Sequence, residues 1–85
     1  MAKAQMTVEA QSVGNMVLVT KSDSTRFAPT IGLSCNVAGD VNVLCEGMTS
    51  PVVRTILAGV DYPWRVIGVY SASTTATGIV ALYQN

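Results

Sequence analysis

Short apolar runs, separated by turn residues at intervals of about 8–12 residues, are the feature that most restricts the fold of this chain. The runs occupy residues 16–20, 31–37, 41–45, 51–57, 64–70 and 78–84. None of them shows the apolar spacing of an amphipathic helix. The pattern predicts an all-β fold, a small antiparallel β-sandwich or barrel of about six to seven short strands.

Residues 31–37 and 41–45 both alternate apolar side chains with small or polar ones. A two-residue turn between these runs would mix apolar and polar residues on one face. A three-residue turn ending at Gly39 pairs Leu33 with Val43 and collects the apolar residues on one face. We therefore predict a hairpin with this register, with Gly39 in the left-handed conformation that such a turn requires.

This predicted register separates the two cysteines of the chain. Cys35 and Cys45 would lie four pairs apart, roughly 13 Å at ~3.3 Å per residue, whereas a disulfide requires Cα atoms within about 7 Å. We predict buried free thiols. Two cysteines without any histidine also argue against a zinc site, and nothing in the chain indicates a cofactor.

Two later segments complete the expected sheet structure. Residues 46–50 are predicted to close a hairpin that leads into the run at 51–57. The run at 64–70 carries apolar residues on both faces, with Val66 on one and Val69 on the other. Such a strand is either central in its sheet or covered by a neighbouring subunit.

The first third of the chain is less regular. Residues 1–11, with Met6 and Val8 on one side, predict an extended arm or edge strand, although a short helix is an alternative. Residues 16–20 predict a buried strand, and residues 21–29 a long polar loop.

That loop contains Arg26 and Phe27 and is the best candidate for docking onto a partner, because it is long, polar and carries one large apolar residue. We divide the chain into residues 1–29, which hold the arm, first strand and docking loop, and residues 30–85, the β-domain. Together they form one structural domain.

Charge is scarce and balanced. Only 12% of the 85 residues are charged and the formal net charge is zero, about half the usual charged fraction. Apolar surface covered by other subunits would account for this, so we expect a homo-oligomer. The alternative is a well-packed small domain with a Ser/Thr/Asn surface.

The same composition argues against several classes of partner. Without a basic face the chain is not expected to bind nucleic acid. No apolar run approaches the ~20 residues of a membrane span. The start of the chain lacks the apolar segment of a secretion signal, so we expect synthesis and assembly in a cytoplasm.

Catalytic chemistry is not indicated. The chain has no histidine, which removes the commonest general base and the Ser-His and Cys-His nucleophile pairs. Its carboxylates are scattered and its glycines form no phosphate-binding loop. We expect a protein that is not an enzyme.

The aromatic pair Tyr62 and Trp64 has three open interpretations: core filler, subunit contact, or a platform for stacking a sugar. Arg65 follows Trp64 directly and Arg54 lies on the preceding run; both are expected to be solvated or paired across a subunit boundary. The candidate residues for contact with other subunits or with another partner are Met6, Val8, Arg26, Phe27, Arg54, Tyr62, Trp64 and Arg65.

Four motifs follow one another in a particular order: Gly39-Asp40-Val41-Asn42-Val43, Leu57-Ala58-Gly59, Pro63-Trp64-Arg65-Val66, and the Thr-Thr-Ala-Thr turn with its Ile-Val-Ala-Leu strand in residues 74–82. With these motifs the chain resembles, over about residues 30–83, the spike base proteins of tailed-phage heads and of gene transfer agents. The resemblance implies a small β-domain that forms a ring at capsid vertices and carries a fibre outward. Residues 44–49 are less polar than that family's second hairpin, and the first 29 residues match nothing in it.

We therefore expect a non-enzymatic structural virion protein on the capsid surface, assembled in the host cytoplasm and serving as a vertex spike or fibre base. Its expected partners are copies of itself, as a pentamer or trimer, the major capsid protein, and a fibre protein. The alternatives are a trimeric decoration (cement) protein and a carbohydrate- or receptor-binding module.

Overall fold

The computed structural model describes residues 13–84, and this part of the chain forms six β-strands and no helix. Each strand falls within or overlaps one of the predicted apolar runs. The strands are β1 (Asn15–Leu18), β2 (Gly32–Ser34), β3 (Gly39–Cys45), β4 (Val52–Ile56), β5 (Val66–Tyr70) and β6 (Val80–Tyr83).

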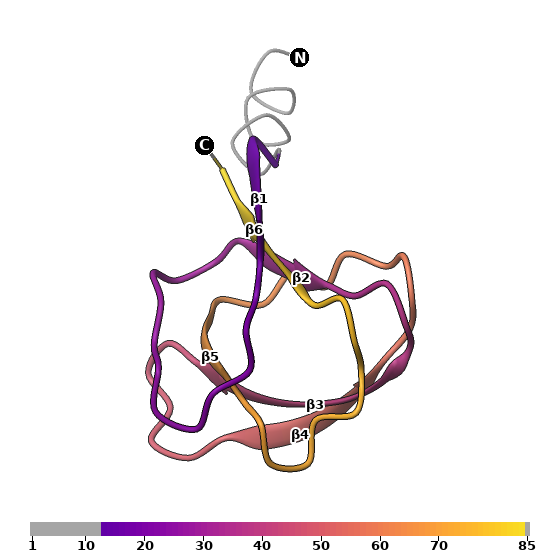
Figure 1. The fold of residues 1–85 in the computed structure, drawn as a ribbon. Helices are drawn as coiled ribbons and strands as arrows, with labels where there is room; N and C mark the ends of the chain where they lie inside the picture. The colour runs from indigo at the N-terminus through magenta and orange to yellow at the C-terminus, as the bar shows by residue number, and fades with distance from the viewer. Residues whose placement is uncertain (1–12, 85) are drawn as a thin grey trace.

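The strands form two three-stranded antiparallel sheets, with strand orders β1-β6-β2 and β4-β3-β5. The two sheets lie on opposite sides of the molecule, and β1 and β6 extend together beyond its body (Figure 1). The all-β prediction is confirmed, and of its two forms the sandwich is present rather than a closed barrel.

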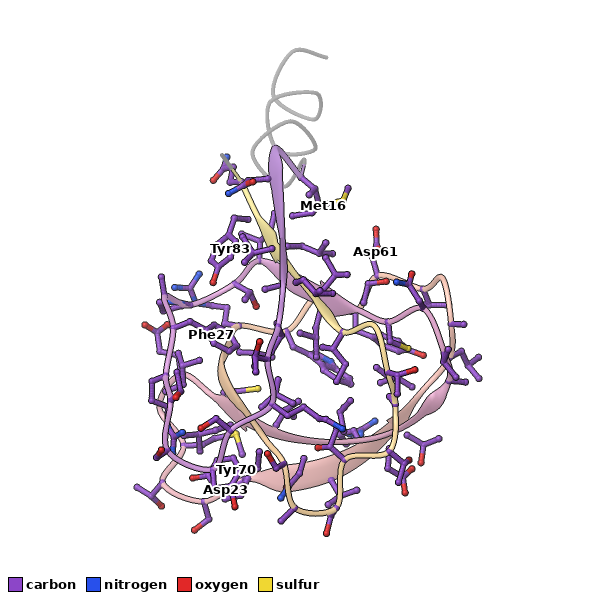
Figure 2. All side chains as sticks on the ribbon, viewed as in Figure 1. Met16, Asp23, Phe27, Asp61, Tyr70 and Tyr83 are labelled. Atoms are coloured by element: carbon purple, nitrogen blue, oxygen red, sulfur yellow. The ribbon has the colours of Figure 1, made fainter. Side chains whose placement is uncertain are left out.

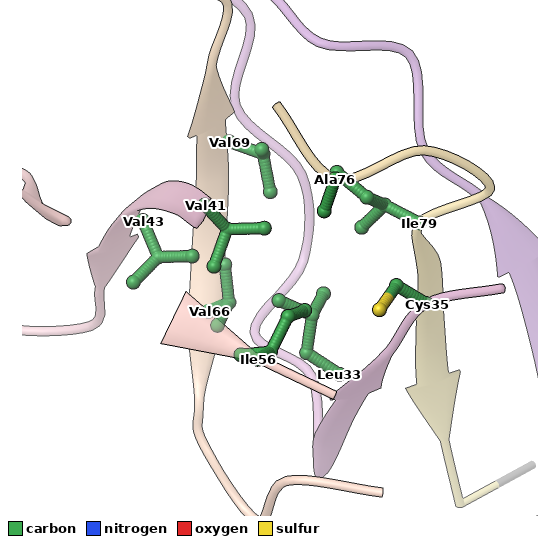
Figure 3. Packing of buried hydrophobic residues seen from close by; sticks show 9 residues of the cluster. All are labelled: Leu33, Cys35, Val41, Val43, Ile56, Val66, Val69, Ala76 and Ile79. Carbon is green, nitrogen blue, oxygen red and sulfur yellow. The ribbon is translucent and has the colours of Figure 1, made fainter. Parts of the chain in front are cut away.

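The core lies between the sheets and draws on both (Figure 3). β2 and the residues beside it supply Leu33 and Cys35, while β3, β4 and β5 supply the opposite wall. The cluster consists of Leu33, Cys35, Val41, Val43, Ile56, Val66, Val69, Ala76 and Ile79, each no more than 3% exposed. Burial of these side chains is the main favourable term for a domain of this size.

The predicted hairpin between the runs at 31–37 and 41–45 is wrong. β2 pairs with β6, and β3 pairs with β4 and β5, so the two runs lie in different sheets. Their apolar residues do share one core, but they reach it from opposite sides. Alternation determines which face of a strand is buried, and it leaves the pairing partner open.

Gly39 is also used differently from the prediction. It opens β3 opposite Ile56, and it is not among the residues with positive φ. A Cβ atom at this position would lie 2.7 Å from the backbone nitrogen of Ala76 and 2.8 Å from Oγ1 of Thr75. Glycine is required here because two backbone segments approach closely, and not because a turn requires a left-handed residue.

The prediction that Val66 and Val69 occupy opposite faces of β5 is wrong as well. Val43 lies opposite Val69 and Cys45 lies opposite Val66, with a register shift between Leu44 and Cys45. This β-bulge inserts one extra residue, so both valines face the core, at 0% and 1% exposure. The apolar content of both faces of this run therefore does not require a neighbouring subunit.

β5 is the edge strand of its sheet and not a central strand, yet the chain covers its outer edge with residues 22–30. The backbone N–H groups of Ser22 and Phe27 donate to the carbonyls of Val69 and Ile67, at 2.9 and 2.8 Å. Beside the bulge, the Thr30 hydroxyl accepts from the N–H of Val66 at 3.0 Å and donates to the Trp64 carbonyl at 2.7 Å. The predicted docking loop thus acts as a cover for this edge.

Residues 71–77, which contain the Thr-Thr-Ala-Thr turn, are hydrogen-bonded to β3. The Thr74 hydroxyl accepts from the N–H of Asn42 at 2.9 Å and donates to the Tyr70 carbonyl at 2.6 Å. The Thr75 hydroxyl accepts from the N–H of Asp40 at 2.9 Å. The turn that contributes most to the family resemblance therefore has a folding role, because it positions β6 across the core.

Two local predictions are confirmed. β3 and β4 form the antiparallel hairpin closed near residues 46–50. Both cysteines are free; Cys35 is buried as predicted, whereas Cys45 is only half-buried. Among residues 13–84, no helix of the length and hydropathy needed to cross a membrane is found.

Candidate assembly surface

β1 is an apolar strand that the fold leaves outside the core. All four of its residues are exposed, with Met16 at 68%, Val17 at 46% and Leu18 at 70%. The prediction of a buried strand at residues 16–20 is therefore wrong. Figure 2 shows Met16 on the part of the molecule that projects away from the body.

The backbone of β1 has one partnered side and one open side. Val19 donates to the carbonyl of Ile79 at 2.8 Å, and Leu18 lies opposite Val80. The alternation of an antiparallel ladder then turns the backbone groups of Met16 and Leu18 away from β6. Within residues 13–84, no backbone hydrogen bond reaches this outer side.

β4 is the second open edge. It is the outermost strand of the β4-β3-β5 sheet, and only Ile56 of its five residues is buried. Val52 and Val53 are 48% and 46% exposed. In the part of the chain that the structure describes, its outer backbone also has no hydrogen-bonded partner.

The other two sheet edges are covered by the chain itself. β5 is covered by residues 22–30, as described above. At β2, Leu33 and Tyr62 exchange two backbone hydrogen bonds of 2.8 Å, which places Tyr62 across the outer side of the strand. An exposed, uncovered apolar edge is a template for pairing with another chain. Within residues 13–84, two of the four sheet edges, those of β1 and β4, have no cover.

Three of the predicted contact residues come together beside β4. The rings of Tyr62 and Trp64 lie 4.9 Å apart at 32°, and the guanidinium of Arg54 lies 5.6 Å from the centre of the Trp64 ring. Tyr62 and Trp64 also pack against the core, and the Tyr62 hydroxyl accepts from the N–H of Leu57 at 2.9 Å. The pair thus acts in part as core filler.

A shallow apolar groove of about 210 Å³ adjoins this cluster. Its lining residues are Val43, Cys45, Met48, Val52, Arg54 and Trp64. The groove lies next to the open edge of β4, so the exposed apolar surface there continues from the strand onto the aromatic side chains.

Arg26 and Phe27 lie on the segment that covers β5. Phe27 packs against the core. Arg26 donates to the Tyr70 hydroxyl at 2.6 Å and lies 4.8 Å from the centre of that ring. At the end of the same segment, Asp23 accepts from the N–H groups of Ser71 and Ala72.

Arg65 forms an ion pair with Glu46 at 2.8 Å, and both side chains are more than half exposed. A pair this exposed contributes about 0–1 kcal/mol, so its role in the monomer is small. Met6 and Val8 lie outside the described residues, and so does the predicted arm at residues 1–11.

The open apolar edges were missed as site residues by the sequence-based predictions. Residues 16–19 are four consecutive apolar residues, a pattern that is typical of a buried strand. The signal that points the other way is the low charge of the whole chain, which indicates covered apolar surface without locating it.

Burial raises the pKa of three groups. The side chains of Cys35, Cys45 and Tyr83 lose contact with water, and this desolvation disfavours their charged forms. A raised thiol pKa lowers the fraction of thiolate, which is the nucleophilic form of cysteine. Among the described residues there is no group of three or more potential metal ligands.

No protein-family model matches the chain, and no curated protein matches it. Among solved structures, it is similar to a chain in the capsid of a native GTA (gene transfer agent) particle computed with C5 symmetry. The two are 29% identical, with a TM-score of 0.73, and the match covers 84% of this chain and 83% of the other.

Proposed function

We propose that this chain is a non-enzymatic structural component of a phage-like or GTA-like capsid, and that it serves as the base of a spike at the vertices. The observation that carries the proposal is the similarity to the GTA capsid chain in fold, sequence and length. That capsid structure was computed with C5 symmetry, a symmetry that a ring of five copies at a vertex would share.

In this proposal the protein forms a homo-oligomer on the outside of the capsid, with the major capsid protein below and a fibre protein above. Exposed apolar strands supply the contacts between copies. Residues 1–11, with Met6 and Val8, act as an arm that attaches the oligomer to the shell. Assembly takes place in the host cytoplasm.

Two measurements test the proposal. Light scattering of the purified protein gives the native mass: five copies support the vertex base, and three copies favour the trimeric decoration protein instead. Gold-labelled protein is then added to particles produced without it and located by electron microscopy. Labels restricted to vertices are expected, and failure to bind any particle would contradict the capsid role.

A truncation tests the arm separately. Removal of residues 1–11 leaves every described strand in place, so the truncated protein is expected to fold but to bind particles less well. Unchanged particle binding would rule out the arm as the attachment element while leaving the vertex position intact.

A further inference from the structure

We infer that the outer edge of β1 in one copy pairs with the outer edge of β4 in the next copy, head to tail, so that the two sheets continue across the subunit boundary. This inference rests on the proposed homo-oligomer and specifies the contact that builds it. The occupant of each open edge is a second copy of this chain.

The first argument is the distribution of covered edges. The chain covers β2 with Tyr62 and β5 with residues 22–30, through backbone hydrogen bonds of 2.8–2.9 Å at Leu33, Ser22 and Phe27. It provides no such cover for β1 or β4 within residues 13–84. Native folds protect edges that must remain single, so the two unprotected edges are the ones suited to a partner strand.

The second argument is that the two open edges match in length and chemistry. β1 has four residues and β4 has five. Each edge carries exposed apolar side chains, Met16 and Leu18 on β1, and Val52 and Val53 on β4. Arg54 is the one charged residue in the two strands, so their approach brings no like charges together.

The third argument concerns symmetry. The open edges belong to different sheets, and pairing β1 with β1 would leave both copies of β4 uncovered. Pairing β1 with β4 covers both kinds of edge in every copy. Such a heterologous contact can repeat around a rotation axis and forms a ring where the rotation closes, whereas an isologous contact stops at two copies.

The test uses one lysine on each edge of the full-length protein, Leu18→Lys on β1 and Val53→Lys on β4, because a charged lysine opposes strand pairing. Each variant alone is expected to change the native mass from an oligomer to a monomer in light scattering. Val37→Lys is the matched control: this valine is 56% exposed but lies on neither open edge, and its variant should keep the wild-type mass. Circular dichroism and urea unfolding verify that each variant is folded.

Mixing the two edge variants provides the decisive measurement. The Leu18→Lys copy retains an intact β4 and the Val53→Lys copy retains an intact β1, so one contact can form between them. The expected product is a one-to-one heterodimer that grows no further. If the mixture stays monomeric, the β1–β4 contact is wrong.

A backbone variant provides an independent check. The Leu18 N–H points away from β6, so Leu18→Pro removes an outward donor and leaves the bonds to β6 in place. It is expected to abolish assembly as Leu18→Lys does. Assembly that survives both β1 variants in folded protein would overturn the inference.

Other outcomes identify other occupants. A wild-type protein that remains a monomer at high concentration overturns the inference. A dimer that Val53→Lys leaves intact also overturns it, because such a dimer indicates β1–β1 pairing. If removal of residues 1–11 abolishes assembly while Leu18→Lys leaves it intact, the arm and not the β1 edge makes the contact between copies, and the inference is wrong. Edge variants that assemble normally and still bind particle vertices would disprove this contact while the proposed function stands.

Discussion

β1 and β6 are neighbouring strands of four apolar-rich residues each, yet they have opposite roles. Leu82 of β6 is 3% exposed and Ala81 is 1% exposed, whereas Met16, which lies opposite Leu82, is 68% exposed. β6 is central in its sheet, with β1 on one side and β2 on the other. The difference shows that apolar content alone does not decide a strand's burial. What packs against the strand decides it, since β2, the other edge strand of this sheet, has Leu33 at 0% exposure.

β6 is also tied to the opposite sheet through residues 71–77, while β1 has no comparable attachment among the described residues. One strand therefore holds the monomer together, and the other is available to a partner. Four predictions sharpen this contrast.

The largest expected effect separates the two leucines of these strands. Leu82→Ala should lower the free energy of unfolding by about 2–5 kcal/mol, because it removes buried methyl groups and leaves a cavity. Leu18→Ala should change it by no more than about 0.5 kcal/mol, because the side chain is 70% exposed. Urea denaturation of dilute protein, below the concentration at which it assembles, measures both values.

A volume-conserving control supports the interpretation. Leu82→Met should cost less than about 1.5 kcal/mol if packing is the cause. Equal losses for Leu82→Ala and Leu18→Ala would show that β1 is buried in the monomer, contrary to the structure.

The second prediction concerns the connection that places β6. Thr74→Val keeps the shape of the side chain but leaves the buried N–H of Asn42 without its acceptor, at an expected cost of about 1–3 kcal/mol. Thr75→Val is the matched control, since its partner, the N–H of Asp40, is in an exposed contact and can bond to water. Thr74→Val should lower the thermal unfolding temperature more than Thr75→Val does. A larger decrease for Thr75→Val would contradict the prediction.

The third prediction compares the strands without mutation. Amides of β1 in the monomer should exchange with deuterium faster than those of β6, because β1 makes few buried contacts and can open locally. Mass spectrometry or NMR of dilute protein measures the rates. On assembly, protection of β1 should rise more than protection of β6, and no such change would count against β1 as a contact.

The smallest effect is a pH dependence at the end of β6. The Tyr83 hydroxyl donates to the Ala28 carbonyl at 2.9 Å, and burial raises its pKa above the usual 10.0. The folded state therefore favours the protonated phenol. The resulting stability is fully present below pH 10.0 and is lost as the pH rises through the higher pKa of the folded state.

Unfolding in urea between pH 8 and roughly 11 measures this loss, since the usual pKa of tyrosine is about 10. The raised pKa values of Cys35 and Cys45 give a similar loss that begins near pH 9.0. Comparison of Tyr83→Phe with the wild type isolates the tyrosine, because both retain the cysteines. A Tyr83→Phe protein with an unchanged alkaline slope would show that Tyr83 ionises equally well in both states.

The aromatic cluster illustrates how far site prediction from sequence reached. Tyr62 and Trp64 are close in sequence and Arg54 lies on the preceding run, and the structure brings the three side chains together. Phe27, chosen because a large apolar residue stood in a polar loop, packs instead against the core of its own chain. Exposure is a property of the whole fold, so a loop's composition alone cannot show which of its residues remain available.

Local features of the sequence determine where the strands lie, because alternation, turn residues and the absence of a helical period act over a few neighbouring residues. They also determine that the runs at 31–37 and 41–45 turn their apolar faces to a core. Only the tertiary structure decides that β2 and β3 belong to different sheets, that a bulge turns both Val66 and Val69 inward, and that β1 stays outside. Strand pairing joins residues far apart in the chain, and its outcome depends on how all six strands together bury the most apolar surface and satisfy their backbone groups.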